Sequence, residues 1–191
     1  RYTASHRVCP VDAAFQTDRV VCSGAAVESY EPRFVYHGFR YAVVKGLRQA
    51  PKPEDAVACV IHTAFPTIGS FACSDATFNA LMEMGDKAYR GNFVDGVPTD
   101  CPHREKNGWT GDASIASELA QYLFENTAAY EKWLRDLLDA QLPDGNLPGI
   151  VPSSGWGYHW GNGAGWDSAL PVIAWNLWTY RGDRRILDEV Y

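Results

Sequence analysis

Three carboxyl side chains lie close together in the run Val97–Asp112. They belong to Asp100, Glu105 and Asp112, and an arginine, a histidine and a tryptophan stand between them. Hydrolysis of a glycosidic bond requires one carboxylic acid that protonates the leaving oxygen and one carboxylate that activates water or attacks carbon. Further carboxylates can hold sugar hydroxyls. This run is therefore a candidate active-site loop.

A solvated surface connection is the plain alternative for the same run. Two features count against it: its two prolines and two glycines restrict the backbone, which suits pre-organised groups, and Trp109 is large and apolar. Asp112 stands where a helix is expected to start, and the positive end of a helix dipole favours its charge. A metal site at Asp100, Cys101 and His103 is disfavoured, because neighbouring residues seldom ligate one metal together.

Helices are expected to position this loop. After residue 70 the apolar side chains recur at helical spacing. The expected helices begin near Asp75, Asp112, Asn126, Asp167 and Asp183. Short and long connections alternate between them, and the unusual residues lie in the long ones. The pattern predicts helical hairpins with functional residues gathered at one end.

The first third of the chain has strand-like patterns instead. Phe34–Tyr36, Phe39–Val44 and Ala58–Thr63 are rich in aromatic, apolar and β-branched residues, and turn-forming residues separate them. We expect this region to be the end of an antiparallel β domain. Because the first residue is not Met, we also expect the true start of the protein to lie upstream.

All seven tryptophans lie in the second half of the chain. Trp156, Trp160 and Trp166 fall in a glycine-rich loop, where they either pack on a rim of helices or form a wall for a sugar, since an aromatic face packs well against the C–H face of a sugar ring. Asp167, next to this loop, is either a helix cap or a ligand of a sugar hydroxyl.

Charge and composition exclude several classes of protein. The net charge of −6 argues against nucleic acid or an anionic membrane as the main partner, because both need a basic surface. No apolar run is long enough to cross a bilayer. The five cysteines form no CxxC pair, which disfavours a zinc ribbon, and buried thiols at unrelated places are the simplest interpretation. The compartment stays open: periplasmic, secreted or cytoplasmic.

The runs Pro98–Glu105 and Gly108–Ala113 strongly resemble the signature of bacterial α-L-rhamnosidases, glycoside hydrolase family 78. The resemblance extends through most of the chain, to Glu31–Phe34, Tyr36–Tyr41, Gly69–Phe71, Trp166–Ala169 and Tyr180–Asp183. It implies a mixed fold: residues 1–68 form the C-terminal part of an antiparallel β-sandwich, and residues 69–191 form the first hairpins of an incomplete (α/α)6 six-hairpin barrel.

The resemblance also implies an activity, the release of terminal α-L-rhamnose from oligosaccharides or glycosides by an inverting mechanism. It implies that Glu105 is the general acid, and it requires neither a cofactor nor a catalytic metal. The implied or candidate residues for substrate binding are Asp100, Arg104, Trp109, Asp112, Trp160 and Asp167.

One departure from the family bears on activity. The family's general base is a glutamate further along the barrel than Tyr191, so we expect a fragment without the base that is inactive and poorly soluble in isolation. Two alternatives remain: another six-hairpin glycosidase, acting on a glucoside or uronide, or a carbohydrate-binding protein without catalysis.

Overall fold

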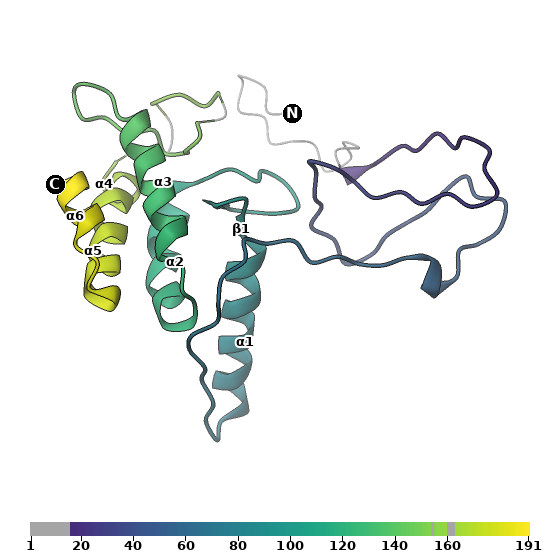
Figure 1. The fold of residues 1–191 in the computed structure, drawn as a ribbon, viewed down its shortest axis with the longest axis horizontal. Helices are drawn as coiled ribbons and strands as arrows, with labels where there is room; N and C mark the ends of the chain where they lie inside the picture. The colour runs from purple at the N-terminus through teal and green to yellow at the C-terminus, as the bar shows by residue number, and fades with distance from the viewer. Residues whose placement is uncertain (1–15, 154, 160–162) are drawn as a thin grey trace. The chain divides into compact units, whose positions relative to one another are not determined.

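The computed structural model describes residues 16–153, 155–159 and 163–191. The chain divides into two compact units (Figure 1). The first unit holds the residues up to Cys59 together with Pro102–Arg104, and the second holds Val60–Cys101 and Glu105–Tyr191. Each unit is described by itself.

The first unit is irregular in its described part. Its regular element is a short 3-10 helix, η2 (Pro53–Asp55). The strands predicted at Phe34–Tyr36, Phe39–Val44 and Ala58–Thr63 are not formed among the described residues. An extended segment becomes a β-strand only when its backbone pairs with a neighbouring strand, and these segments form no such ladder among the described residues. Side-chain hydrogen bonds connect parts of this unit instead: the side-chain amide of Gln16 pairs with both backbone groups of Gly38, each at 3.0 Å.

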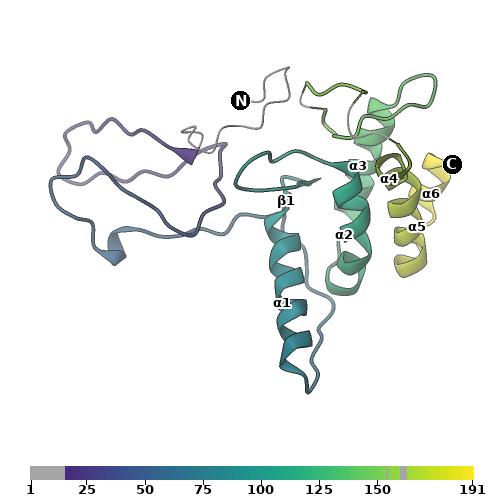
Figure 2. The ribbon, with the colours of Figure 1, turned by 180° about the vertical axis from the view of Figure 1, so that it is seen from behind.

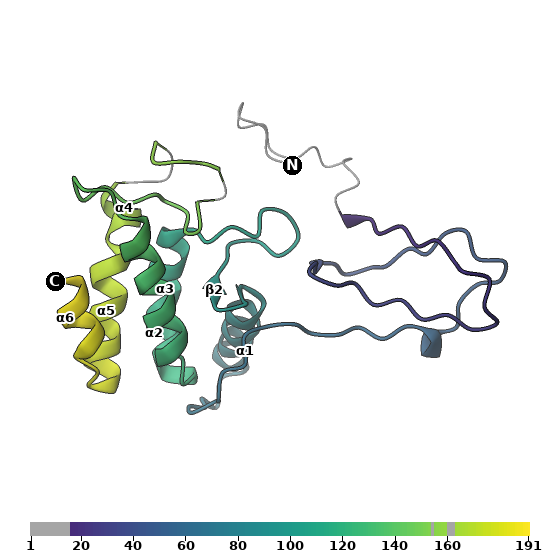
Figure 3. The same cartoon turned by 45° about the horizontal axis from the view of Figure 1, so that its top comes forward.

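The second unit is helical. Its elements in chain order are α1 (Ala76–Gly91), β1 (Phe93–Val94), β2 (Val97–Pro98), α2 (Thr110–Leu123), α3 (Thr127–Ala140), α4 (Ala164–Asp167), α5 (Ala169–Arg181) and α6 (Arg185–Val190). The axes of α2, α3 and α5 run roughly side by side, and the long connections lie at one end (Figures 1 and 3). The predicted gathering of the long connections is therefore confirmed within this unit.

Most helix boundaries agree with the predictions from caps. The carboxylate of Asp75 accepts the Thr77 N–H at 2.7 Å and caps α1, α3 follows Asn126, and α5 ends at Gly182, whose φ of 69° suits glycine. The exception is α2, which begins at Thr110 rather than near Asp112. No side chain caps α2. Instead the carbonyl of Gly149 accepts the Thr110 N–H at 2.9 Å, so a distant backbone group does the work of a cap.

A hairpin replaces the loop expected after α1. β1 and β2 pair antiparallel, with Phe93 opposite Pro98 and Val94 opposite Val97. The two residues between them, Asp95 and Gly96, both have positive φ, 56° and 75°. Such a pair of left-handed residues forms the tight turn that matches the twist of two paired strands. This hairpin carries the chain directly into the candidate active-site loop.

The core of the second unit lies between its helices. α2 packs against α1 and α5, and α3 packs against α5 and α6. Both opposite views place α1 at one edge of this unit and α6 at the other (Figures 1 and 2). The largest fully buried side chains are Trp133, Tyr130, Phe93, Phe124 and Leu134. The ring of Tyr89 stacks on that of Phe124 at 5.2 Å, which joins α1 to the end of α2.

Several apolar side chains on the predicted helix faces stay exposed. Ile115, on α2, is 85% exposed although the spacing placed it with buried Ala120. Phe71, Met82 and Ile115 line an open apolar groove between α1 and α2. Among the helices that the structure describes, none has the length and apolar character needed to cross a membrane.

Substitution of Leu134 tests whether this residue belongs to the core of the second unit. Its side chain is fully buried, whereas Lys132 on the same helix is 54% exposed and pairs with Asp136. We expect Leu134→Ala to lower the free energy of unfolding by about 2–5 kcal/mol, because it leaves a cavity. Lys132→Ala should change it by about 0.5 kcal/mol or less. Urea unfolding followed by circular dichroism measures both, and equal losses would contradict the assignment of Leu134 to the core.

Candidate functional site

Backbone hydrogen bonds close the candidate active-site loop at its base. The Asp100 N–H donates to the Asn107 carbonyl at 3.0 Å, and the Asn107 N–H donates back to Oδ1 of Asp100 at 2.9 Å. One step further in, the Lys106 N–H donates to the Cys101 carbonyl at 3.2 Å. Asp100 therefore holds the loop with its main chain and its carboxylate together. Sequence reasoning missed Asn107, which is buried.

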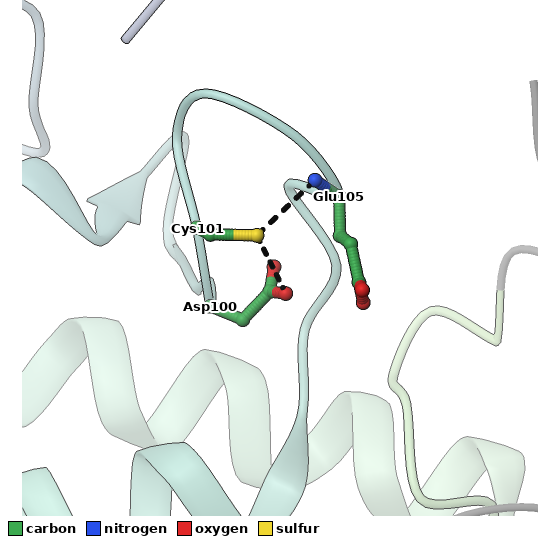
Figure 4. A group of neighbouring side chains, drawn as sticks. All are labelled: Asp100, Cys101 and Glu105. Atoms are coloured by element: carbon green, nitrogen blue, oxygen red, sulfur yellow. Dashed lines mark hydrogen bonds between the residues drawn. The ribbon is translucent and has the colours of Figure 1, made fainter. Parts of the chain in front are cut away.

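The thiol of Cys101 points into this loop (Figure 4). It donates to Oδ2 of Asp100 at 3.0 Å, and its sulfur accepts the backbone N–H of Glu105 at 3.3 Å. Sequence reasoning treated this cysteine as one of several buried thiols. Its place between two acidic residues of the motif was the available signal for a role in the site.

Glu105 is held at its other end by Trp109. The indole Nε1–H of Trp109 donates to Oε2 of Glu105 at 2.9 Å, across a spacing of four residues. Both residues are half-buried. The Trp109 ring meets the ring of Trp156 edge-on at 5.6 Å, so the long loop of aromatics does contribute to this region. Trp156 is one of the tryptophans predicted either to pack on a rim of helices or to form a wall for a sugar.

A second backbone pairing fixes the loop to the segment after α3. The Val151 N–H donates to the Gly108 carbonyl at 2.9 Å. Two residues after Gly108, the N–H and the hydroxyl of Thr110 both donate to the Gly149 carbonyl. A side chain at Gly108 would place Cβ 2.1 Å from the Val151 carbonyl oxygen, so only glycine fits. Trp133 ties this segment to the core, because its indole N–H donates to the Val151 carbonyl at 3.0 Å.

Asp112 lies in the first turn of α2. The residue is exposed overall, yet partial burial of its carboxyl raises the pKa of Asp112, and the negative charge of Asp100 raises it further. The structure therefore brings these two predicted binding residues within electrostatic reach of each other. Beside them, the Trp166 ring covers Gly111 so closely that an added Cβ would lie 2.8 Å from it.

Three further residues are predicted to bind substrate, namely Arg104, Trp160 and Asp167. Arg104 is exposed and groups with the first unit, so its role in binding stays a prediction. Trp160 lies outside the described residues. Asp167 is the last residue of the short helix α4, and its Oδ2 accepts the Gly163 N–H at 2.9 Å. It does not cap the helix expected to begin near it, because Ser168 is the N-cap of α5, so its role in binding stays a prediction.

The carboxylates of Asp100 and Glu105 and the thiol of Cys101 also form a group of metal-ligand type, with ligand atoms within 4.8 Å of one another. This set differs from the metal hypothesis that the sequence raised, because Glu105 replaces His103. Zinc binds a cysteine as the thiolate, so a metal here would replace the hydrogen bond between Cys101 and Asp100.

Comparison with known proteins assigns both parts of the sequence. Residues 66–191 match the family model of the bacterial alpha-L-rhamnosidase 6 hairpin glycosidase domain. The chain belongs to the bacterial α-L-rhamnosidase family. Residues 4–62 match the bacterial alpha-L-rhamnosidase concanavalin-like domain. The resemblance stated from the motif is confirmed, and the mixed fold is confirmed at the level of these two domain families.

Curated α-L-rhamnosidases are similar over nearly the whole chain. The protein of Streptomyces avermitilis is 39% identical over 98% of this chain, and one from Formosa agariphila is 35% identical over 92%. The chain spans 18% and 19% of the lengths of these relatives, so it corresponds to about a fifth of an α-L-rhamnosidase.

Solved structures of the family are similar too. The α-L-rhamnosidase from Dictyoglumus thermophilum superposes with a TM-score of 0.78 and 38% identity, covering 84% of this chain and 18% of its own. The Streptomyces avermitilis α-L-rhamnosidase, solved in complex with L-rhamnose, has a TM-score of 0.63 and 38% identity, covering 68% of this chain and 12% of its own.

The coupling between Asp100 and Asp112 is testable. We expect Asp100→Asn to lower the pKa of the Asp112 carboxyl, because it removes one of the two causes that raise it. A pH titration of the carboxyl carbon of Asp112 by NMR measures the change. Asp144→Asn, in the turn after α3, is the control and should leave that pKa unchanged. An unchanged pKa in Asp100→Asn would contradict the coupling.

Proposed function

We propose that this chain supplies the proton-donor half of the active site of a longer α-L-rhamnosidase, which releases terminal α-L-rhamnose with inversion at the anomeric carbon. One observation carries the proposal. The carboxylate of Glu105 is fixed by the Trp109 indole at 2.9 Å while Cys101 holds its backbone N–H, in a loop that Asp100 also closes. A proton donor needs such fixed placement beside the bond that it cleaves.

We assign the domains accordingly. Residues 1–68 are the end of the β-sandwich, and residues 69–191 are the first hairpins of the (α/α)6 barrel. The two family matches, which meet between residues 62 and 66, support a boundary in this region. The hairpins α2–α3 and α5–α6, with their long connections at one end, support the barrel. The sandwich strands would then find their partners in other parts of the longer protein.

The contacts suggest how Glu105 works. In the reaction its carboxylic acid gives a proton to the glycosidic oxygen and becomes a carboxylate. The indole N–H of Trp109 then donates to a charged oxygen, and hydrogen bonds to a charged acceptor are roughly twice as strong as neutral ones. This contact therefore favours the state after proton transfer.

Asp100 and Asp112 are the proposed ligands of the rhamnose hydroxyls. Each carboxylate oxygen can accept about two hydrogen bonds. The oxygens of Asp100 already accept the Cys101 thiol and the Asn107 N–H, which orients the group and leaves lone pairs for a sugar. We propose Arg104, Trp160 and Asp167 as further contacts. The general base would hold a water between itself and the sugar, with about 6.5–9.5 Å between the two carboxyl groups, and it lies in the longer enzyme beyond this sequence.

A binding protein without catalysis is the second candidate. The edge-on pair of Trp109 and Trp156, with ring centroids 5.6 Å apart, fits it as well as it fits an enzyme, since such a corner can hold a sugar ring whether or not a bond is broken. The two candidates predict different effects of replacing the carboxyl of Glu105 by an amide, since only the enzyme needs its proton.

Replacement of Glu105 separates the candidates. In the full-length protein we expect Glu105→Gln to lower kcat on an α-L-rhamnosyl disaccharide by about 10²–10⁴-fold, because an alcohol leaves only with a proton. The loss on 4-nitrophenyl α-L-rhamnoside should be smaller. Glu83→Gln, exposed on α1, is the control. Hydrolysis by the wild type of aryl glucosides or uronides, with none of the rhamnoside, would favour another glycosidase. Binding of rhamnose without any hydrolysis would favour the binding protein.

For removal of the hydrogen bond from Trp109 we expect a smaller loss of kcat than for Glu105→Gln. Trp109→Phe keeps an aromatic ring and removes the N–H that reaches Glu105. A hydrogen bond to a charged group contributes about 1.5–3 kcal/mol, so kcat on the disaccharide should fall by roughly tenfold or more. Trp175→Phe, on an exposed part of α5, is the matched control. An unchanged kcat in Trp109→Phe would show that this bond does not assist proton transfer.

A further inference from the structure

The thiol of Cys101 joins two acidic residues that the proposed mechanism uses separately. Its S–H donates a hydrogen bond to Oδ2 of Asp100, and its sulfur accepts a hydrogen bond from the backbone N–H of Glu105 (Figure 4). Asp100 is at the base of the loop, which the Asp100–Asn107 bonds close. Glu105 is four residues beyond Cys101. The thiol therefore bridges the loop between its fixed base and the residue that carries the proposed acid.

This bridge needs a neutral side chain that donates one hydrogen and accepts another. A thiol has one S–H and sulfur lone pairs, so it meets both demands. The direction of the two bonds is linked, because the carboxylate of Asp100 draws the thiol hydrogen and leaves the lone pairs of sulfur facing the Glu105 N–H. Alanine can make neither bond. Serine can make both, although its smaller oxygen lengthens one contact or the other.

The consequence for Glu105 is that it is held at two points. The thiol fixes its backbone at 3.3 Å, and the indole of Trp109 fixes its carboxylate at 2.9 Å. The backbone contact sets where the side chain starts, and the indole contact sets where it ends. Loss of the first contact removes one restraint on the backbone from which that carboxyl group extends.

We propose that Cys101 is a positioning residue, which places the carboxyl of Glu105 for proton transfer and couples it to the sugar-binding carboxylate of Asp100. This rests on the proposed function. The thiol contacts the backbone N–H of Glu105 and acts through it. Its loss should therefore slow the step that needs a proton more than it weakens binding.

The test uses the full-length enzyme with Cys101→Ala and Cys101→Ser, each assayed on two substrates. A misplacement of about 1 Å costs on the order of 10²-fold in rate. We expect Cys101→Ala to lower kcat on an α-L-rhamnosyl disaccharide by about 10–10²-fold. On 4-nitrophenyl α-L-rhamnoside, whose leaving group departs with little help from an acid, kcat should fall by less than about threefold. Cys101→Ser should recover part of the loss. Cys59→Ala, which removes an exposed thiol, is the control.

Three outcomes would overturn the proposal: equal losses on both substrates, a rise in KM alone, or no loss at all. Thermal unfolding of each variant and titration of its folded fraction correct kcat for misfolded protein, and Cys101→Ser serves as the test if the alanine variant does not fold. The proposed function fails on different evidence, namely a Glu105→Gln variant whose losses do not depend on the leaving group. A failure of the proposed role of Cys101 is therefore distinguishable from a failure of the proposed function.

Discussion

The site depends on a short backbone pairing between two segments far apart in the sequence. Gly108 and Thr110 exchange hydrogen bonds with Gly149 and Val151, and the indole of Trp133 anchors the second segment to the helical core. Buried backbone groups without partners cost free energy, so this pairing fixes both segments at once. It starts α2, sets the end of the loop that carries Glu105, and requires glycine at position 108.

Around this pairing, the loop is ordered by its own polar groups. Asp100 accepts from a backbone N–H and from a thiol, and Glu105 accepts from an indole while its N–H reaches the same thiol. Acidic side chains that are proposed to contact a sugar thus also shape the backbone. A group held in this way loses little further freedom when substrate binds, which is the advantage of pre-organisation.

The family assignment and the geometry support each other but say different things. Sequence similarity assigns the two domain types. It extends over nearly the whole chain, which spans about a fifth of the length of its relatives. The geometry adds how the motif is held: by a hairpin at its start, by a distant carbonyl at the first turn of α2, and by a thiol at its centre. These features explain why glycine, cysteine and tryptophan stand among the carboxylates of the motif.

The sequence by itself determined most of the helices and the family. Helical spacing and caps such as Asp75 placed α1, α3 and α5, since these signals are local, and the motif singled out Glu105, Asp100 and Asp112. Tertiary structure alone decided the rest. The strands expected near Phe39–Val44 are not formed in the described unit, because a strand exists only with a partner. The start of α2 moved to Thr110 because the carbonyl of Gly149 caps it. The contacts of the Cys101 thiol and the effect of Asp100 on the pKa of Asp112 depend on distances in the folded protein. The spacing of these residues along the chain does not encode those distances.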